Sequence, residues 1–310
     1  MRLEEELAKS SPNKDMLLTI GVFDGVHIGH RYLISQLTEQ ARQQNLLSGV
    51  ITFRRHPQEV LSPQTKLPFL TSLAERTRLL KNEGVEAVIT LPFTHELAEI
   101  SARQFVTLLQ KHLRMRGMVI GPDFALGRNR EGDANTLRQL GQEIGFSVTV
   151  TPPMMVNGEV ASSTAIRKAL DVGDMGKVSN LMGHAFSLQG RVTIGNSRGI
   201  GFPTANLDID SKYALPTEGV YATLAHIDRK AYQSMTNIGK CPTFGDNERT
   251  VEVYVLNYQG NLYRHELKID IIERLRNEKQ FDTVEELKQQ IIEDIKQGKA
   301  ILDAQGNNQP

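Results

Sequence analysis

Residues 21–30 read GVFDGVHIGH and lie between two segments of different character. The residues just before them, MLLTI at positions 16–20, are mostly apolar and predict a short buried strand. After them, apolar residues recur at helical spacing over residues 33–41. We therefore expect residues 21–30 to form a strand-to-helix loop, where free backbone N–H groups and the positive end of a helix dipole can receive a phosphate.

The residue types in this loop favour a nucleotide site. Gly21 and Gly25 let the backbone turn tightly, and Gly29 leaves room for a flat base or ribose one turn into the helix. His27 and His30 lie near the helix start, where imidazoles can donate hydrogen bonds to phosphate oxygens during attack on an α-phosphate. The plainer interpretation is a tight turn with two surface histidines. The ATP-binding candidates in the loop are Gly21, Phe23, Asp24, Gly25 and Gly29.

The first half of the chain alternates predicted strands with predicted helices. This order predicts a Rossmann-like α/β domain, in which helices wrap a parallel sheet and functional loops lie at the carboxyl ends of the strands. No GxxxxGK[ST] motif appears and no GxGxxG follows a strand, so ATP would bind in another way. The predicted strands are residues 16–20, 47–53, 87–91 and 118–121, and the predicted helices after the loop's own are residues 73–82, 102–113 and 135–143.

After residue 183 the pattern changes to short β-rich runs separated by turn residues. Such runs predict an antiparallel β-barrel or sandwich. We therefore expect two domains, residues 1–184 and residues 185–310. The β-rich runs are residues 187–194, 217–227, 231–238, 250–258 and 262–272.

A final helix is expected near the end of the chain. Thr283 and Glu286 fit a capping box at its start, and Gly298 is a plausible end. The apolar residues recur at helical spacing and predict one buried stripe. The stripe consists of Val284, Leu287, Ile291 and Ile295.

The composition excludes several classes of protein. The chain has 310 residues, enough for two cores, and its 36 Lys and Arg residues equal its 36 Asp and Glu residues, so it lacks the basic surplus of proteins that hold long nucleic acids. Cys241 is the single cysteine, which excludes an internal disulfide and a zinc site of several thiolates. The acidic, polar opening and the lack of a long apolar run predict a soluble, cytoplasmic protein.

With its His-Ile-Gly-His ending, the loop resembles the signature of the nucleotidyltransferase superfamily, which includes class I aminoacyl-tRNA synthetases. The full string is similar to the version in prokaryotic FAD synthetases, the bifunctional riboflavin kinase/FMN adenylyltransferases. The resemblance spans nearly the whole chain. Further matching segments in the first half are residues 52–53, 56–57, 121–124, 127, 132–133 and 162–167.

This resemblance implies that the first half transfers AMP from MgATP to FMN, which forms FAD and releases pyrophosphate. His27, His30 and Arg167 would then be catalytic. No covalent enzyme intermediate is needed, because positioning and charge stabilisation supply the catalysis. The position of FMN stays open, and its candidate contacts are Phe53, His56 and Phe93.

Residues 162–167 also make physical sense on their own. Hydroxyls of Ser163 and Thr164 at a helix start can cap the helix and contact phosphate, and Arg167 one turn later offers a bidentate fork. The alternative is an ordinary N-cap with a solvent-exposed arginine. Asp123 could receive the ribose hydroxyls or a metal, although an isolated aspartate of this kind is usually a turn residue.

In the second half, residues 201–207 (GFPTANL) resemble the PTAN motif of riboflavin kinases. In an extended segment Thr204 and Asn206 point to the same side, and their neutral oxygens suit a Mg²⁺ ion shared with ATP phosphates. The alternative is a polar strand edge. The resemblance implies that Gly190, Gly201 and Pro203 contact the kinase nucleotide, and that Leu275, Arg276 and Phe281 contact the flavin.

Glu252 is the expected catalytic base of the second half. It alternates with Val251 and Val253, so its side chain faces away from the valines. A carboxylate there could accept the proton of the riboflavin 5′-hydroxyl, or it could simply be solvated. The match of residues 250–263 to the catalytic strand of the family favours the base.

The second half also departs from the family pattern. Only Ile200 stands between Gly199 and Gly201, where the family usually has a longer segment over the phosphates. The positions after Glu252 differ as well, and we therefore expect riboflavin phosphorylation to be weak or absent. The departing residues are Tyr254, Asn257, Asn261 and Arg264.

Three alternatives share the first loop. A tRNA-charging enzyme would normally have a lysine-rich KMSKS-like loop and a basic surface, and neither is evident. Another small-molecule adenylyltransferase would not explain the PTAN half. A flavin-binding regulatory protein without turnover would explain the altered kinase residues but not the intact His27, His30 and Arg167. We expect small-molecule substrates, no nucleic-acid or membrane partner, and a monomer or weak homo-oligomer.

Overall fold

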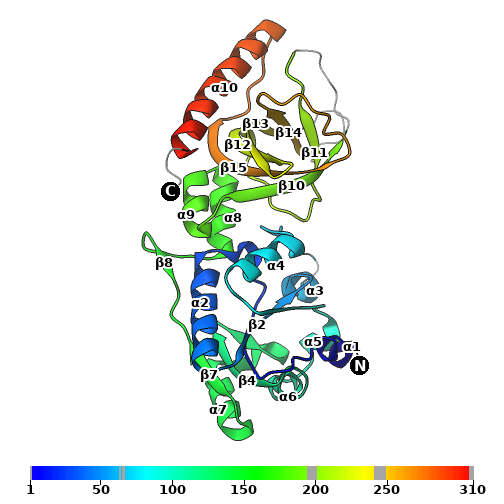
Figure 1. The fold of residues 1–310 in the computed structure, drawn as a ribbon, viewed down its shortest axis with the longest axis vertical. Helices are drawn as coiled ribbons and strands as arrows, with labels where there is room; N and C mark the ends of the chain where they lie inside the picture. Colours follow the sequence, from blue (N-terminus) through cyan, green and yellow to red (C-terminus); the bar gives the residue numbers. More distant parts are fainter. Residues whose placement is uncertain (1, 63, 65–66, 194–200, 241–248, 307–310) are drawn as a thin grey trace. The chain divides into compact units, whose positions relative to one another are not determined.

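The computed structural model describes residues 2–62, 64, 67–193, 201–240 and 249–306 (Figure 1). It divides into two compact units, Met1–Ser163 and Thr164–Pro310. The domain boundary expected after residue 184 stays a prediction. Within the described part of the chain, no helix is both long enough and apolar enough to cross a membrane.

A five-stranded parallel sheet forms the centre of the first unit. Its strand order is β3-β2-β1-β4-β7, so the order reverses between β1 and β4. In open α/β sheets, ligands bind beside such a reversal, at the carboxyl ends of the strands. The strands are β1 (Met16–Ile20), β2 (Leu47–Phe53), β3 (Ala87–Leu91), β4 (Met115–Ile120) and β7 (Ser147–Val150).

Helices pack on both faces of this sheet, which confirms the predicted α/β class. Consecutive β1 residues point to opposite faces of the sheet. Leu17 belongs to the core that contains α2 and α4, and Leu18 to the core that contains α1, α6 and α7. The helices are α1 (Arg2–Ala8), α2 (Ile28–Gln43), α3 (Pro57–Leu61), α4 (Leu73–Asn82), α5 (His95–Ala98), α6 (Ala102–Leu113) and α7 (Ala134–Ile144). Short elements complete the unit: η1 (Asp24–Val26), β5 (Ala125–Leu126), η2 (Arg128–Arg130), β6 (Gly132–Asp133), β8 (Met155–Val156) and β9 (Glu159–Val160).

The second unit begins with two helices and continues as a closed barrel of antiparallel strands. The ring order is β10-β11-β14-β13-β12-β15, and β15 pairs with both β10 and β12 to close it. The sequence predicted either a barrel or a sandwich, and the closed ring of strands shows that the unit is a barrel. The elements are α8 (Ser163–Val172), α9 (Met175–Met182), β10 (Phe186–Thr193), β11 (Ala205–Asp208), β12 (Gly219–Ile227), β13 (Lys230–Lys240), β14 (Arg249–Val255) and β15 (Glu266–Arg276).

The terminal helix α10 (Val284–Gly306) runs along the outside of the barrel (Figure 1). One half of the predicted capping box is present, because the Glu286 N–H donates to Thr283 Oγ1 at 3.2 Å. The predicted end at Gly298 is wrong. Gly298 is buried, and a Cβ there would lie 2.3 Å from Met235 Sδ, so this glycine lets the helix approach β13 rather than ending it. Val284, expected in the buried stripe, is 48% exposed.

Candidate functional site

The loop after β1 begins at the strand-order reversal of the first unit. Residues 21–27 follow β1, and residues 121–124 follow β4, the neighbour on the other side of the reversal. All strands of the sheet are parallel, so both segments lie at its carboxyl edge. The predicted loop therefore occupies the usual ligand-binding position of this fold.

The backbone of this loop is strained. Phe23 and Val26 have φ angles of 54° and 39°, and Gly25 between them has 81°. A left-handed conformation is a genuine outlier for a β-branched or bulky residue, and each such residue costs about 1–3 kcal/mol. Phe23 and Val26 are 2% and 1% exposed. Tertiary contacts must therefore hold the loop in this shape.

Asp24 supplies part of that hold. Its carboxylate is buried and accepts the Leu70 N–H at 2.9 Å and the Thr71 N–H at 3.1 Å. The Gly25 N–H in turn donates to Thr71 Oγ1 at 3.0 Å. Buried hydrogen bonds to a carboxylate are among the strong ones, so Asp24 orders the loop. Its expected contact with ATP stays a prediction.

His27 and His30 lie together at the start of α2. His27 is the N-cap residue, and its Nδ1 accepts the His30 N–H at a long 3.4 Å. The two rings stack with their centroids 3.6 Å apart and their planes at 23°. When Nδ1 of a neutral imidazole accepts a hydrogen bond, Nε2 carries the proton. Nε2 of His27 is therefore a donor beside the helix N-terminus.

The pKa of His30 is held well below its usual value. The largest cause is burial, and electrostatic interactions with His27 and with the Arg76 guanidinium lower the pKa further. The ring keeps part of its surface exposed, but its Nδ1 atom is buried and has no hydrogen-bond partner within the described part of the chain. Burial therefore favours the neutral form of the His30 imidazole.

At two of the loop glycines, neighbouring atoms of the protein leave little room for a side chain. A Cβ on Gly29 would lie 2.9 Å from the Ala161 carbonyl oxygen and 3.1 Å from His27 Nδ1, and one on Gly21 would lie 3.0 Å from the Phe23 ring. The space beside Gly29 is thus filled by the backbone and the imidazole. The expected contact of Gly29 with a base or ribose stays a prediction.

The remaining predicted nucleotide residues divide between the two units. Ser163 Oγ donates to the Asp24 carbonyl at 2.9 Å, which ties the end of the first unit to the loop. Asp123 is exposed in the turn after β4, where its carbonyl accepts from Arg130 Nη2 at 2.9 Å. Thr164 and Arg167 belong to the second unit, on α8, so their roles toward the loop stay predictions.

The predicted flavin contacts of the first unit lie after β2 and β3, again at the carboxyl edge of the sheet. The rings of Phe53 and Phe93 meet edge to face, with centroids 5.3 Å apart. His56 caps α3 through its Nδ1, which accepts the Gln58 N–H at 3.2 Å. A cavity of about 330 Å³ opens beside them. Its lining residues are Arg55, Glu59, Val60, Phe93, Thr94 and His95.

In the barrel, strand register brings the predicted kinase residues together. Asn206 on β11 pairs with Glu252 on β14, and Glu252 pairs in turn with Asn237 on β13. Directly paired residues point to the same face of a sheet. Val251 and Val253 are 2% and 0% exposed, whereas the three polar residues are partly exposed, so they form a polar row on the outer face. Asn237 was not among the predicted residues.

Other predicted barrel residues have structural partners. Arg276 donates to the carboxylate of Asp294, Nε at 2.8 Å and Nη2 at 2.7 Å, and lies over the Phe281 ring at 5.9 Å. Leu275 packs against α10. A Cβ on Gly190 would lie 2.5 Å from the Asp208 carbonyl oxygen. Their predicted contacts with flavin or nucleotide stay predictions.

The segment before the PTAN motif is only partly described. Gly201, Pro203 and Thr204 are exposed, and Gly201 has a φ of 89°. Cys241 and the shortened segment around Gly199 lie outside the described residues.

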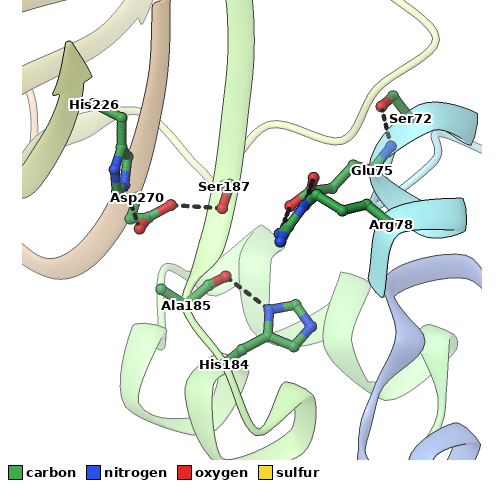
Figure 2. A network of polar contacts seen from close by, with 8 residues as sticks. All are labelled: Ser72, Glu75, Arg78, His184, Ala185, Ser187, His226 and Asp270. Carbon is green, nitrogen blue, oxygen red and sulfur yellow. Dashed lines mark hydrogen bonds and ion pairs between the residues drawn. The ribbon is translucent and has the colours of Figure 1, made fainter. Parts of the chain in front are cut away.

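Sequence reasoning also missed a polar cluster in the barrel and a buried arginine in the first unit. In this cluster, His226 Nε2 lies 2.7 Å from Asp270 Oδ2, and Ser187 Oγ donates to Asp270 Oδ1 at 2.6 Å (Figure 2). His226 lies six residues along β12 from Val220, which pairs with Asn237, so by strand rise it is about 20 Å from the polar row.

The buried arginine is Arg76, which is 1% exposed and shares the core-facing side of α4 with Leu80. That position in the helical pattern is the signal that could have revealed it.

Comparisons with known proteins agree with both units. A family model described as FAD synthetase matches residues 9–165, and one described as riboflavin kinase matches residues 182–302. Among the relatives, the bifunctional riboflavin kinase/FMN adenylyltransferase of Escherichia coli (strain K12) is 37% identical over 92% of each chain, and that of Pseudomonas fluorescens is 34% identical over 93% of this chain and 94% of its own. A crystal structure described as a macrolide-efflux protein from Streptococcus pneumoniae matches with a TM-score of 0.87 and 30% identity, and covers 94% of this chain and 95% of its own.

Proposed function

The chain belongs to the family of bifunctional riboflavin kinase/FMN adenylyltransferases. We propose that residues 21–30 catalyse its adenylyl transfer, and that the polar row of Asn206, Glu252 and Asn237 catalyses its phosphoryl transfer. The enzyme phosphorylates riboflavin to FMN and joins FMN to AMP from ATP, so FAD is its final product. The comparisons lend no support to a weakened kinase half or to a purely regulatory flavin-binding protein.

In adenylyl transfer, an FMN phosphate oxygen attacks the α-phosphorus of ATP. A new phosphoanhydride bond forms between FMN and AMP. At the same time the bond between the α-phosphorus and the oxygen that bridges the α- and β-phosphates breaks, and pyrophosphate leaves. The single observation that carries the proposal is the stacked pair His27 and His30 at the N-terminus of the 16-residue helix α2, beside the strand-order reversal. Both imidazoles and the helix dipole would stabilise the charge that grows on the phosphate oxygens.

The neutral state of His30 fits this role. A bound triphosphate brings negative charge, which raises the pKa of a nearby imidazole. The arrival of the nucleotide would therefore favour the protonated form of His30 more than the protein alone does. Ser163, which bonds the loop backbone, would contact the phosphates, and Asp123 the ribose. The phosphate contacts that the family resemblance implies for Thr164 and Arg167 stay predictions.

The cavity at the carboxyl ends of β2 and β3 is the proposed site of the FMN ring. Its volume of about 330 Å³ lies within the range of small-molecule pockets, and it lies on the same sheet edge as the β1 loop. Phe93 lines it and contacts Phe53, which gives the ring an aromatic neighbour. His56 would border the same site.

In the kinase half, Glu252 would accept the proton of the riboflavin 5′-hydroxyl as this oxygen attacks the terminal phosphorus of ATP. The hard oxygens of Thr204 and Asn206 would suit a Mg²⁺ ion, and Asn206 pairs with Glu252, which places that ion beside the base. Within the described residues, no three His, Cys, Asp or Glu side chains gather as a metal site, which suits an ion held largely by ATP phosphates. When bound, Mg²⁺ neutralises charge on those phosphates.

The remaining parts of the proposal concern organisation. We assign adenylyl transfer to residues 1–184 and phosphorylation to residues 185–310. We propose a cytoplasmic monomer or weak homo-oligomer that acts on small molecules and does not bind nucleic acid, in keeping with its equal numbers of acidic and basic residues.

The test uses the full chain with MgATP and either FMN or riboflavin, and quantifies each flavin product by chromatography. We expect His30→Ala to lower the rate of FAD formation from FMN by about 10²–10³-fold, because it removes a donor to the developing charge. Riboflavin phosphorylation should be unchanged, and so should both rates in the control His265→Ala, whose ring is exposed. Equal FAD formation by His30→Ala and the wild type would contradict the proposal.

A further inference from the structure

The segment just before α4, residues 70 and 71, holds the strained loop at several points. From residues 70 and 71, two backbone N–H groups donate to the Asp24 carboxylate, and the Thr71 hydroxyl accepts the Gly25 N–H. Leu70 packs directly on Gly25, where a Cβ would lie 2.9 Å from Leu70 Cδ1. These contacts all reach the loop near Gly25.

Arg76 reaches the loop at a second place, just after β1. Its guanidinium is almost fully buried, and Nη1 donates to the Val22 carbonyl at 2.7 Å while Nη2 donates to the Phe53 carbonyl at 2.9 Å. Val22 belongs to the loop after β1, and Phe53 is the last residue of β2. Thr52 Oγ1 also donates to the Val22 carbonyl, at 2.8 Å. One planar fork thus ties the start of the loop to the end of the neighbouring strand.

The chemistry of this fork is specific to arginine. A guanidinium presents rigid, coplanar N–H groups that can bond two separate carbonyls at once, whereas a lysine ammonium is a compact charge on a flexible stem. The bridge joins the loop after β1, which leads to the stacked histidines, to the last residue of β2, which leads to the cavity. A shift of Val22 would be passed along the strained residues Phe23 and Val26 to His27.

We propose that Arg76 is a positioning residue for adenylyl transfer, because it fixes the Val22 and Phe53 carbonyls and thereby the place of His27 and His30 relative to the flavin cavity. This inference rests on the proposed function of residues 21–30. Arg76 itself is not assigned a contact with ATP or FMN. Its proposed effect passes through the backbone, and Arg76→Lys tests this because it keeps the positive charge that helps to lower the pKa of His30.

The experiment compares Arg76→Lys with Arg78→Lys in the full chain. Arg78 lies on the same helix but is 52% exposed, and it pairs with Glu75 at 2.7 Å (Figure 2). We expect Arg76→Lys to lower kcat for FAD formation by about 10- to 100-fold, since a misplacement near 1 Å has an effect of that size. The KM for ATP and the rate of riboflavin phosphorylation should change by less than about twofold, and Arg78→Lys should behave as the wild type.

A second variant guards against a purely structural effect. Arg76→Ala leaves a space of guanidinium shape, so added guanidinium should restore part of its FAD formation while methylammonium should not. The inference is overturned if Arg76→Lys keeps the wild-type kcat, or if both activities fall together with the thermal midpoint and guanidinium restores neither. Absence of FAD formation in the wild type would instead refute the proposed function.

Discussion

The two proposed sites of this chain are built in opposite ways. The adenylyl site is one continuous loop whose backbone is strained at Phe23 and Val26 and held by buried contacts. The kinase site is a row of partly exposed side chains that strand register places side by side, Asn206 with Glu252 and Glu252 with Asn237. The first depends on backbone shape and the second on side-chain chemistry. Changes to packing should therefore harm the first more, and changes to single functional groups should isolate the second.

The largest expected effect concerns the base of the kinase row. Glu252→Gln keeps the size of the side chain but removes the proton acceptor, so riboflavin phosphorylation should slow by about 10²–10⁴-fold. FAD formation from FMN should keep its wild-type rate, since Glu252 belongs to the other unit. The measurement is the two-substrate assay, with Glu266→Gln at the exposed start of β15 as the matched control. An unaltered phosphorylation rate would remove Glu252 from the mechanism.

A smaller effect tests the dependence of the loop on backbone shape. Gly25→Ala forces alanine into a φ of 81° and also brings its Cβ to 2.9 Å from Leu70 Cδ1. Gly84 has a φ of 85°, and a Cβ added to it would meet nothing within 4 Å, so Gly84→Ala reports the backbone cost alone. We expect losses in unfolding free energy of about 2–3 kcal/mol for Gly25→Ala and about 1–2 kcal/mol for Gly84→Ala. Chemical denaturation measures both, and equal losses would mean that the contact with Leu70 relaxes freely.

The smallest effect is a pH dependence that belongs to the loop. The pKa of His30 is lowered in the folded chain, while in the unfolded chain it is near 6.5. Between these two values the unfolded chain binds a proton that the folded chain does not, so the unfolding free energy falls as pH decreases below about 6.5. The loss is at most about 1.4 kcal/mol per pH unit.

Denaturation of the wild type at a series of pH values below neutrality measures this slope. In His30→Gln the part of the pH dependence of the unfolding free energy that comes from His30 should disappear. In His265→Gln, where the replaced histidine is exposed in the barrel unit, that part should remain. Identical slopes in the wild type and in His30→Gln would show that the buried imidazole does not titrate in this way.

Much of the fold followed from periodicity. The predicted strands at residues 16–20, 47–53 and 87–91, and the helices at residues 73–82 and 102–113, match β1, β2, β3, α4 and α6 at both ends. These segments are either almost wholly apolar or clearly amphipathic. Strand β7 (Ser147–Val150) was not predicted, because it is an edge strand with polar residues at alternate positions and is only partly buried.

The candidate sites were predictable to different depths. The loop is contiguous, so its glycines and histidines are visible as one string, but the strain at Phe23 and the hold by Asp24 and Arg76 depend on contacts from residues about fifty positions away. The kinase row joins three strands, so only pairing reveals that Asn237 stands beside Glu252. Gly298 was misjudged for the same reason, since its neighbour Met235 is distant in sequence.

The closed ring of the barrel has a consequence for how the chain is made. Phe186 on the first strand of the ring pairs with Ile271 on the last, so the ring cannot close before residue 271 has been synthesised. The sheet of the first unit is complete once β7 has emerged, before any strand of the barrel has been synthesised. A ribosome-bound chain can therefore fold its first unit while the second still waits for its closing strand, because domains fold as units during synthesis.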